Sequence, residues 1–168
     1  GNLVPVFAGS VSKDIGVEEL MNAIISLFPS PLAAGSKKFE NGNELKLVSG
    51  GQGYAYVFKT VADSFIGQLT FFRVLSGSFK PDSEIYCAGK KDKEHLGALM
   101  LMNGKNHANM SEALPGAVFA ATKLKNIAIC DTVSTAHTEN TFPKTVYPSP
   151  VMCYAITAAK SGEEEKIS

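Results

Sequence analysis

The sequence predicts a mainly β fold, an antiparallel barrel of six to eight short strands with an N-terminal βα unit in front of it. The barrel is predicted because β-branched and aromatic residues dominate a series of short segments, and because turn-forming residues separate each segment from the next. The βα unit is predicted because apolar residues recur at helical spacing near the start of the chain. Together these observations indicate one complete β domain with pieces of other domains attached.

Residues 1–30 are interpreted as a strand over residues 3–8 followed by a helix over residues 17–28. Acidic residues stand in the first helical turn, where the helix dipole favours negative charge, and Pro29-Ser30-Pro31 ends the helix. An apolar strand of this kind belongs in a mostly parallel sheet covered by helices. Because nothing else in the sequence supplies that sheet, we expect these residues to be the C-terminal piece of a larger domain.

Residues 31–52 are rich in Gly, Ser, Asn and Lys and are predicted to be a linker with at most one short strand, near residues 45–48. The glycines in Ser49-Gly50-Gly51-Gln52-Gly53 raise the question of a phosphate-binding loop. No Gly-Lys-Ser/Thr sequence and no helical pattern follows them. We therefore interpret these glycines as a turn into the barrel.

The predicted barrel occupies residues 53–147. Its first two strands, residues 54–61 and 69–75, are joined by a polar turn, and Lys80-Pro81-Asp82-Ser83 supplies the next turn. Further strands are expected at residues 84–88, 95–102, 117–124, 132–135 and 145–147.

Residues 148–168 contain one more predicted strand, residues 150–156, and the start of a helix that Ser161 could cap. Acidic residues follow in what would be its first turn. A helix this short cannot bury an apolar face, so we expect both ends of the chain to belong to neighbouring domains.

Composition limits the class of protein. No stretch approaches the roughly 20 apolar residues that a membrane span requires, so no membrane partner is expected. The 16 basic and 16 acidic side chains cancel, so a nucleic-acid partner must be met by a local patch. Cys87, Cys130 and Cys153 form no Cys-x-x-Cys pair, which indicates neither a disulfide framework nor a zinc site and favours a reducing, cytoplasmic setting.

No arrangement of catalytic residues is evident, since the three histidines have no partner residues at a spacing typical of acid/base or nucleophilic sites. The densest charged segment, Lys90-Lys91-Asp92-Lys93-Glu94, is expected on a loop between strands. It is either a solvated hairpin tip or a group of lysines that neutralises RNA phosphates. Lys59, Arg73, Lys80 and Lys105 are further candidates for phosphate contact if the barrel places them on one face.

The segment from residue 56 to 86 resembles the opening of the second domain of elongation factor G and its relatives among the translational GTPases. The residues that carry the resemblance are Phe58-Lys59-Thr60-Val61-Ala62-Asp63, then Gly67 and Leu69, Phe72-Arg73-Val74 and Ser76-Gly77. It continues in Leu101-Met102-Asn103-Gly104-Lys105 and in Pro115-Gly116-Ala117-Val118 with Lys123-Leu124. Two departures occur: Ala117 replaces the family's Asp, and Ile129-Cys130-Asp131-Thr132 replaces its Thr-Gly-Asp-Thr turn, which loses a glycine.

The resemblance implies the end of a GTPase domain in residues 1–30, a linker in 31–52, a second-domain barrel in 53–147 and the start of a third domain in 148–168. Ala8-Gly9-Ser10-Val11-Ser12-Lys13 is similar to the family's last guanine-nucleotide motif, which implies that Ser10, Val11 and Ser12 contact guanine in the parent protein. From the residues alone, the same stretch is a strand-to-helix loop, and Ser12 replaces an apolar family residue.

GTP and Mg²⁺ are implied for the parent protein and not for this chain. The phosphate loop, the magnesium-binding residues and the Asn-Lys-x-Asp type motif do not occur in the sequence. Tight GTP binding and hydrolysis need phosphate and Mg²⁺ contacts. We therefore expect this fragment to hold no cofactor and to be no enzyme by itself.

As a piece of an elongation factor G-like protein, the chain is expected to dock the factor on small-subunit ribosomal RNA and to relay movement between the GTPase domain and the later domains. The parent would drive ribosomal translocation with GTP. Arg73, Lys90, Lys91 and Lys93 are the hypothesised RNA contacts. A ribosomal protection protein or an elongation factor G paralogue is the alternative within the family. An aminoacyl or small-ligand binding barrel, as in elongation factor Tu, is the alternative from another class.

Overall fold

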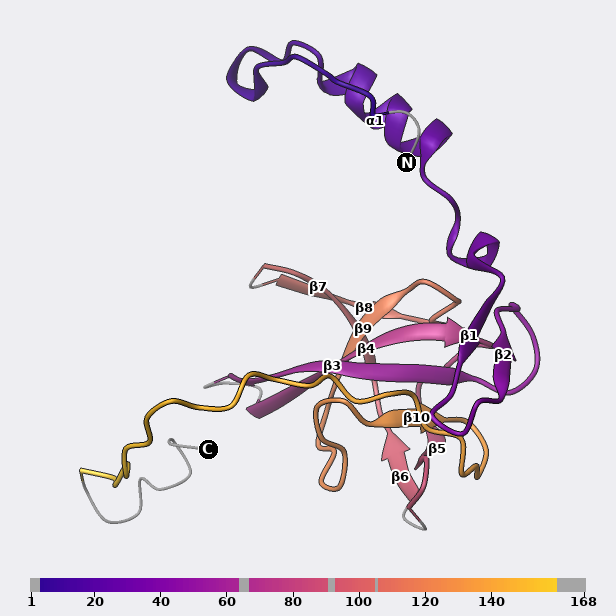
Figure 1. Cartoon of the computed structure of the whole chain (residues 1–168), viewed down its shortest axis with the longest axis vertical. Coiled ribbons are helices and arrows are strands. Elements are labelled where there is room, and N and C mark those ends of the chain that lie inside the picture. The colour runs from indigo at the N-terminus through magenta and orange to yellow at the C-terminus, as the bar shows by residue number, and fades with distance from the viewer. Residues whose placement is uncertain (1–3, 64–66, 91–92, 105, 160–168) are drawn as a thin grey trace.

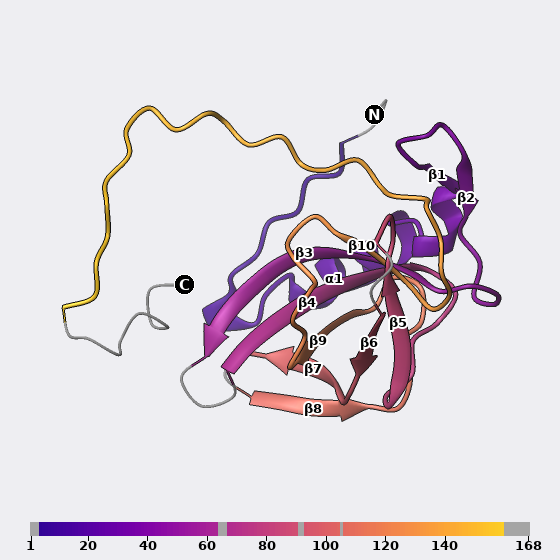
Figure 2. The ribbon, with the colours of Figure 1, turned by 90° about the horizontal axis from the view of Figure 1, so that it is seen from below.

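The computed structural model describes residues 4–63, 67–90, 93–104 and 106–159. Its main part is an antiparallel sheet of eight strands in the order β6-β5-β10-β3-β4-β9-β7-β8. Figure 2 shows these strands curled around a common interior. The prediction of a mainly β, six- to eight-stranded antiparallel fold is confirmed. The strands are β3 (Tyr54–Asp63), β4 (Gly67–Ser76), β5 (Ser83–Cys87), β6 (Lys93–Leu96), β7 (Leu99–Asn103), β8 (Asn106–Met110), β9 (Val118–Thr122) and β10 (Thr132–Ser134).

The central pair of strands, β3 and β4, shows why the sheet has one buried face. Val57 in β3 and Phe72 and Val74 in β4 point inward and are buried, because alternate residues of a strand lie on the same side. The register of the pair shifts between Val57 and Lys59, so Phe58 is the extra residue of a β-bulge. This bulge leaves the Phe58 side chain 43% exposed on the outer face.

The apolar core lies inside the curl of the sheet. The rings of Phe72 and Phe119 stack with their centroids 4.8 Å apart, and Phe79 packs against Phe119 at 5.9 Å. Ile85, Leu96, Leu99 and Val133 belong to the same buried cluster. Aromatic side chains of this size bury a large apolar area, so the three phenylalanines make a major contribution to the core.

Three of the predicted strands are wrong in detail. Residues 95–102 form two strands and not one, because β6 pairs with β5 whereas β7 pairs with β8 and β9, and the chain turns at Gly97-Ala98 between them. Residues 145–147 and 150–156 have no regular secondary structure. Strand β8 was not predicted, since Asn106, His107 and Asn109 give it no apolar alternation; as an edge strand it needs none.

For the N-terminal unit, the predicted helix is confirmed and the predicted strand is wrong. The helix α1 spans Val17–Leu27, with Glu18 and Glu19 in its first turn, and lies away from the sheet (Figure 1). Residues 4–8 form no strand, because no neighbouring strand is present to pair with them in the described part of the chain. The large apolar side chains Leu20, Met21, Ile24, Ile25 and Leu27 of α1 are exposed. None of the helices among the described residues is long and apolar enough to cross a membrane. The predicted helix start after residue 160 lies outside the described residues.

Residues 31–52 hold more structure than the one short strand that was predicted. A 3-10 turn, η2 (Pro31–Ala34), precedes the hairpin of β1 (Ser36–Lys38) and β2 (Glu44–Lys46). Phe39 and Leu47 of this segment are buried. The amide of Val48 donates to Ser76 Oγ at 3.1 Å, and the amide of Gly77 donates to the Val48 carbonyl at 2.8 Å. The segment therefore packs on the barrel.

Candidate functional site

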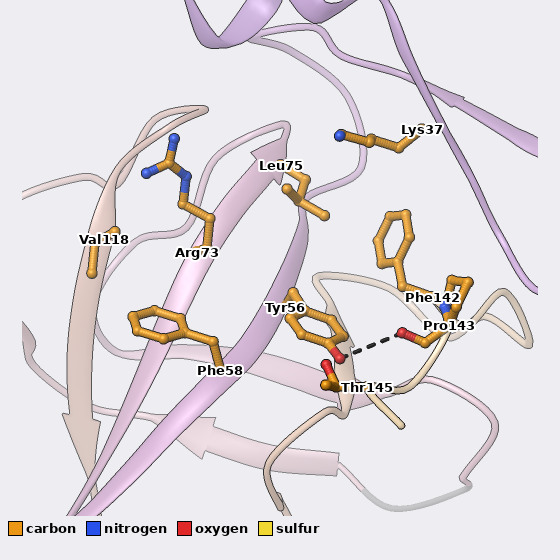
Figure 3. Close-up of a pocket in the computed structure, with 9 residues that line it drawn as sticks. All are labelled: Lys37, Tyr56, Phe58, Arg73, Leu75, Val118, Phe142, Pro143 and Thr145. Atoms are coloured by element: carbon orange, nitrogen blue, oxygen red, sulfur yellow. Dashed lines mark hydrogen bonds between the residues drawn. The ribbon is translucent and has the colours of Figure 1, made fainter. Parts of the chain in front are cut away.

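An open groove lies over the outer face of the central strands (Figure 3). Its volume is about 640 Å³, within the roughly 300–1,000 Å³ that ligand sites occupy. The floor comes from β3, β4 and β9, one side comes from the segment that follows β10, and one residue of β1 stands at the rim. The lining residues are Lys37, Tyr56, Phe58, Arg73, Leu75, Val118, Phe142, Pro143 and Thr145.

The floor of the groove follows from strand alternation. Since Phe72 and Val74 face the core, Arg73 between them faces outward. Arg73 is paired in register with Tyr56 on β3 and with Val118 on β9. The three side chains are therefore neighbours across the sheet, held in place by strands that are hydrogen-bonded on both sides.

The side of the groove is fixed by packing and hydrogen bonds. The Phe142 amide donates to Thr132 Oγ1 at 2.7 Å, and the Phe142 ring lies 4.7 Å from that of Phe39. Tyr56 Oη donates to the Pro143 carbonyl at 3.4 Å, a contact that Figure 3 shows as a dashed line. Burial raises the pKa of Tyr56, so its hydroxyl remains a protonated donor at neutral pH.

Cys130 lies in the turn before β10, at the position where the resemblance implies a glycine. Cys130 has a φ of 69°, so the turn keeps the left-handed conformation that glycine favours. Its amide donates to the Val57 carbonyl at 2.8 Å, which holds the turn against β3. Hydrogen bonding with Tyr56 lowers the pKa of the Cys130 thiol, whose Sγ lies 4.0 Å from Tyr147 Oη.

Of the four proposed RNA-contacting cations, the structure describes three and does not bring these three together. Arg73 lines the groove, whereas Lys90 and Lys93 lie at the β5–β6 hairpin, which β10 and β3 separate from β4. Lys93 Nζ contacts Glu84 Oε1 at 2.7 Å in an exposed ion pair. Lys91 lies outside the described residues.

Lys90 is the partner of a buried carboxylate. Its Nζ lies 2.9 Å from Asp131 Oδ2 and 3.2 Å from the Asn126 carbonyl, and the Asp131 side chain is only 6% exposed. Burial alone raises the pKa of Asp131, but hydrogen bonds from Lys90 and from the Ala128 amide outweigh it and hold the pKa below its ordinary value. Lys144 Nζ stands 3.9 Å from the other carboxylate oxygen. Asp131 is therefore ionised at neutral pH and needs Lys90 beside it.

The proposed guanine-contacting residues lie in the turn before α1, far along the chain from the groove. Val11 and Ser12 are in the 3-10 turn η1 (Val11–Lys13), which Ser10 precedes. Ser10 and Ile15 exchange backbone hydrogen bonds at 2.9 and 3.1 Å, which closes the loop. The described residues contain no group of three His, Cys, Asp or Glu side chains that could hold a metal ion.

Sequence reasoning missed most of the groove. A signal was present in β3, where Tyr56, Val57 and Phe58 are consecutive large apolar residues. One face of a strand can bury only alternate residues, so part of this run had to face outward. The contributions of Lys37 and Phe142 had no local signal, because they reach the groove through tertiary packing.

Comparison with known proteins gives the following relatives. The sequence model of the family described as elongation factor G domain 2 matches residues 52–136. Elongation factor G of Orientia tsutsugamushi (strain Boryong) is 32% identical over 173 residues, covering 100% of this chain and 24% of the relative. Elongation factor G of Wolbachia pipientis subsp. Culex pipiens (strain wPip) is 31% identical, covering 99% of this chain and 25% of the relative. The chain thus spans about a quarter of the length of these curated relatives.

A solved structure supports the fold. The crystal structure of a protein from Thermus thermophilus matches with a TM-score of 0.64 and 24% sequence identity. The match covers 83% of this chain and 19% of that chain. At this identity the likeness concerns the fold alone, and it agrees with the curled antiparallel sheet described above.

Proposed function

The chain belongs to the elongation factor G family, and we propose that it is the module that docks such a factor on the small ribosomal subunit and relays movement between the domains before and after it. The factor as a whole would use GTP and Mg²⁺ to drive translocation in the cytoplasm. Ser10, Val11 and Ser12 would serve the guanine site of that whole factor. The chain itself would contribute contacts and no catalysis.

The observation that carries the relay role is a direct connection between the segments that lead into and out of the barrel. We call residues 39–43 and 138–142 the linker clamp. The Glu40 amide donates to the Thr141 carbonyl at 2.9 Å, and Thr141 Oγ1 donates to Glu40 Oε2 at 2.8 Å. Asn41 Nδ2 donates to Asn140 Oδ1 at 2.8 Å. Segments about a hundred residues apart in sequence are thus hydrogen-bonded side by side.

The linker clamp is also packed onto the barrel. Phe39, Tyr54 and Phe142 form a buried aromatic cluster, with Phe39 5.3 Å from Tyr54 and 4.7 Å from Phe142. Tyr54 is the first residue of β3, so the cluster ties both segments to the central strand. A movement of the domain before the barrel would therefore be transmitted to the domain after it, and the reverse, through packed side chains, which a flexible linker would not do.

For the docking surface, the geometry supports Arg73 best, because its guanidinium opens onto the groove (Figure 3). Lys93 is a second proposed contact, since an exposed ion pair contributes little and can be exchanged for a phosphate. Lys91 stays a proposed contact from the sequence. For Lys90 we propose stabilisation of the barrel through Asp131, because leaving that buried carboxylate unpaired would be costly.

Chemical footprinting of ribosomal RNA on isolated small subunits tests the docking role. We expect the chain to protect a defined set of nucleotides, and Arg73→Ala to reduce that protection. Lys38→Ala, which removes an exposed cation already paired with Glu44, is the matched control and should leave protection unchanged. Absence of protection above background with the native chain would refute docking by this module.

Hydrogen exchange tests the relay role separately. Phe142→Ala removes the ring that joins the outgoing segment to Phe39. We expect the Glu40 amide, which donates to Thr141, to exchange faster in this variant while the core amides of β4 keep their protection. Unchanged exchange at Glu40 would show that the two segments are not coupled.

The groove also favours a second candidate function, an aminoacyl or small-ligand binding barrel. Its apolar floor is preformed, which is typical of ligand sites. Protection of β3 and β4 amides by an aminoacyl-tRNA, but not by the same tRNA without its aminoacyl group, would establish this function.

A further inference from the structure

We propose that the groove over β3, β4 and β9 binds single-stranded RNA, with one base stacked on its aromatic floor and a neighbouring phosphate between Arg73 and Lys37. This inference rests on the proposed docking function for the class of partner. It adds the place, the strandedness and the mode of binding. Figure 3 shows the two cations on the same side of the aromatic side chains.

The groove is rigid before anything binds. Its floor stands on β3, which is paired with β10 and β4, and on β4, which is paired with β3 and β9. Its side is held by the Phe142 amide on Thr132 and by Phe142 packing on Phe39. A ligand would therefore spend little binding free energy on ordering the protein.

The charges of the groove select an anion. Two of its nine lining residues are cations, and none is acidic. Five lysines elsewhere on the described surface face carboxylates: Lys38 pairs with Glu44, Lys80 with Glu112, Lys93 with Glu84, and Lys90 and Lys144 both with Asp131. Among the ion pairs between described residues, none involves Arg73 or Lys37. The groove thus offers positive charge that the fold does not use.

The aromatic side chains select a planar ligand. Phe58 is 43% exposed because of the β-bulge, although a residue of this size is usually buried. Tyr56 lies beside it on the floor, with its hydroxyl occupied by Pro143. Exposed aromatic faces next to a guanidinium are the features that bind unstacked bases and the phosphates beside them.

Two other anionic partners fit less well. An acidic peptide would find no main-chain partner on the floor, because β3 and β4 are hydrogen-bonded on both sides and β-strand addition needs a free edge. Duplex RNA keeps its bases stacked inside the helix and would leave the aromatic floor uncovered. A single strand satisfies both the cations and the aromatic faces.

The test is fluorescence anisotropy of a labelled oligouridylate of about six nucleotides with the full chain, at low and at physiological salt. We expect saturable binding. Phe58→Ala and Arg73→Ala should each weaken it by about tenfold, the size expected for loss of one stacked base or one charged contact. Phe58→Leu, which keeps apolar packing without an aromatic face, should weaken it similarly. Lys38→Ala is the matched control on β1 and should bind like the native chain.

Circular dichroism melting of each variant separates loss of binding from loss of folding. The proposal is overturned if a duplex of the same length or an oligoaspartate binds as tightly as the single strand. It is also overturned if both Phe58 variants bind like the native chain, because attraction would then be purely electrostatic. If the chain protects ribosomal RNA but binds no free oligouridylate, the docking function stands and this inference fails.

Discussion

The ion pair between Lys90 and Asp131 should make a measurable contribution to the stability of the barrel. Asp131 immediately precedes β10, and its carboxylate accepts hydrogen bonds from Lys90 Nζ and from the Ala128 amide, each at 2.9 Å. Replacing Lys90 by methionine keeps most of the side-chain volume and removes the charge. The buried carboxylate is then left with one amide and with Lys144 at 3.9 Å.

The size of the effect follows from the exposure of the two partners. Removing one partner of a fully buried pair costs about 3–5 kcal/mol of unfolding free energy. Asp131 is 6% exposed, but the Lys90 side chain is 42% exposed, so water can replace part of the lost interaction. We expect Lys90→Met to cost about 2 kcal/mol at neutral pH, which lowers the midpoint of urea unfolding by about 1 M.

The effect should depend on pH with a defined sign. The pKa of Asp131 is lowered in the folded state, so its contribution to stability is present above the unfolded pKa of about 3.9 and is lost as pH falls through the lower, folded value. Without Lys90, burial favours the protonated carboxyl of Asp131, so the difference between the native chain and Lys90→Met should be complete at pH 7 and shrink as the pH falls toward the lowered folded pKa of Asp131 in the native chain.

Urea unfolding followed by far-UV circular dichroism, repeated at several pH values, measures this difference. Lys93→Met is the matched control, because Lys93 pairs with the exposed Glu84 and its loss should leave the unfolding midpoint unchanged. A Lys90→Met variant as stable as the native chain at pH 7, or equally destabilised at pH 7 and pH 3, would refute the reasoning.

Three further predictions concern backbone, core and thiols. Gly77→Ala should destabilise the chain by about 1–3 kcal/mol in urea unfolding, because φ is +64° and the new Cβ would lie 2.6 Å from backbone atoms; Gly104→Ala, with φ +60° and open space, should cost less. Phe72→Ala should cost about 3–5 kcal/mol by the same measurement, because it leaves a cavity in the core. In thiol labelling at pH 8 with mass spectrometry, exposed Cys153 should react first and Cys87 last, because burial raises the pKa of Cys87 to about 11. Equal destabilisation by the two glycine variants, a fully stable Phe72→Ala, or early labelling of Cys87 would contradict these predictions.

The strands of the barrel could be predicted because their signal is local. β-branched and aromatic residues dominate residues 54–61 and 69–75, and the observed β3 and β4 extend each prediction by only one or two residues at an end. The predictions fail where the formation of a strand depends on whether another strand is present to pair with it. Residues 150–156 have strand composition, yet an isolated strand has no hydrogen-bond partners and does not form.

The hairpin of β1 and β2 shows the opposite error. Its strands are three residues each and contain one apolar residue between them, Leu45, so composition indicated a linker. Its fixed position depends on Phe39 packing on Phe142 and on Glu40 bonding to Thr141, contacts with a segment about a hundred residues later in the sequence. Without those residues in place, nothing local distinguishes this hairpin from a flexible segment.

The dependence on contacts between residues distant in sequence also explains why the sequence pointed to a loop as the candidate site, whereas the structure points to a sheet face. A lysine cluster such as residues 90–94 is readily interpreted as a phosphate-binding site from the sequence because its charges are adjacent. Whether each charge is available to a ligand depends on residues that are distant in sequence. Lys90, for example, forms an ion pair with Asp131, 41 residues away. Arg73 is a single cation in an apolar strand and gives a weak signal, but strand alternation places it on the outer face, between Tyr56 of β3 and Val118 of β9. In a chain of zero net charge, a nucleic-acid partner must be bound by a local patch, and the groove combines two cations outside the ion pairs of the described residues with the exposed ring of Phe58, which makes it the surface to test first.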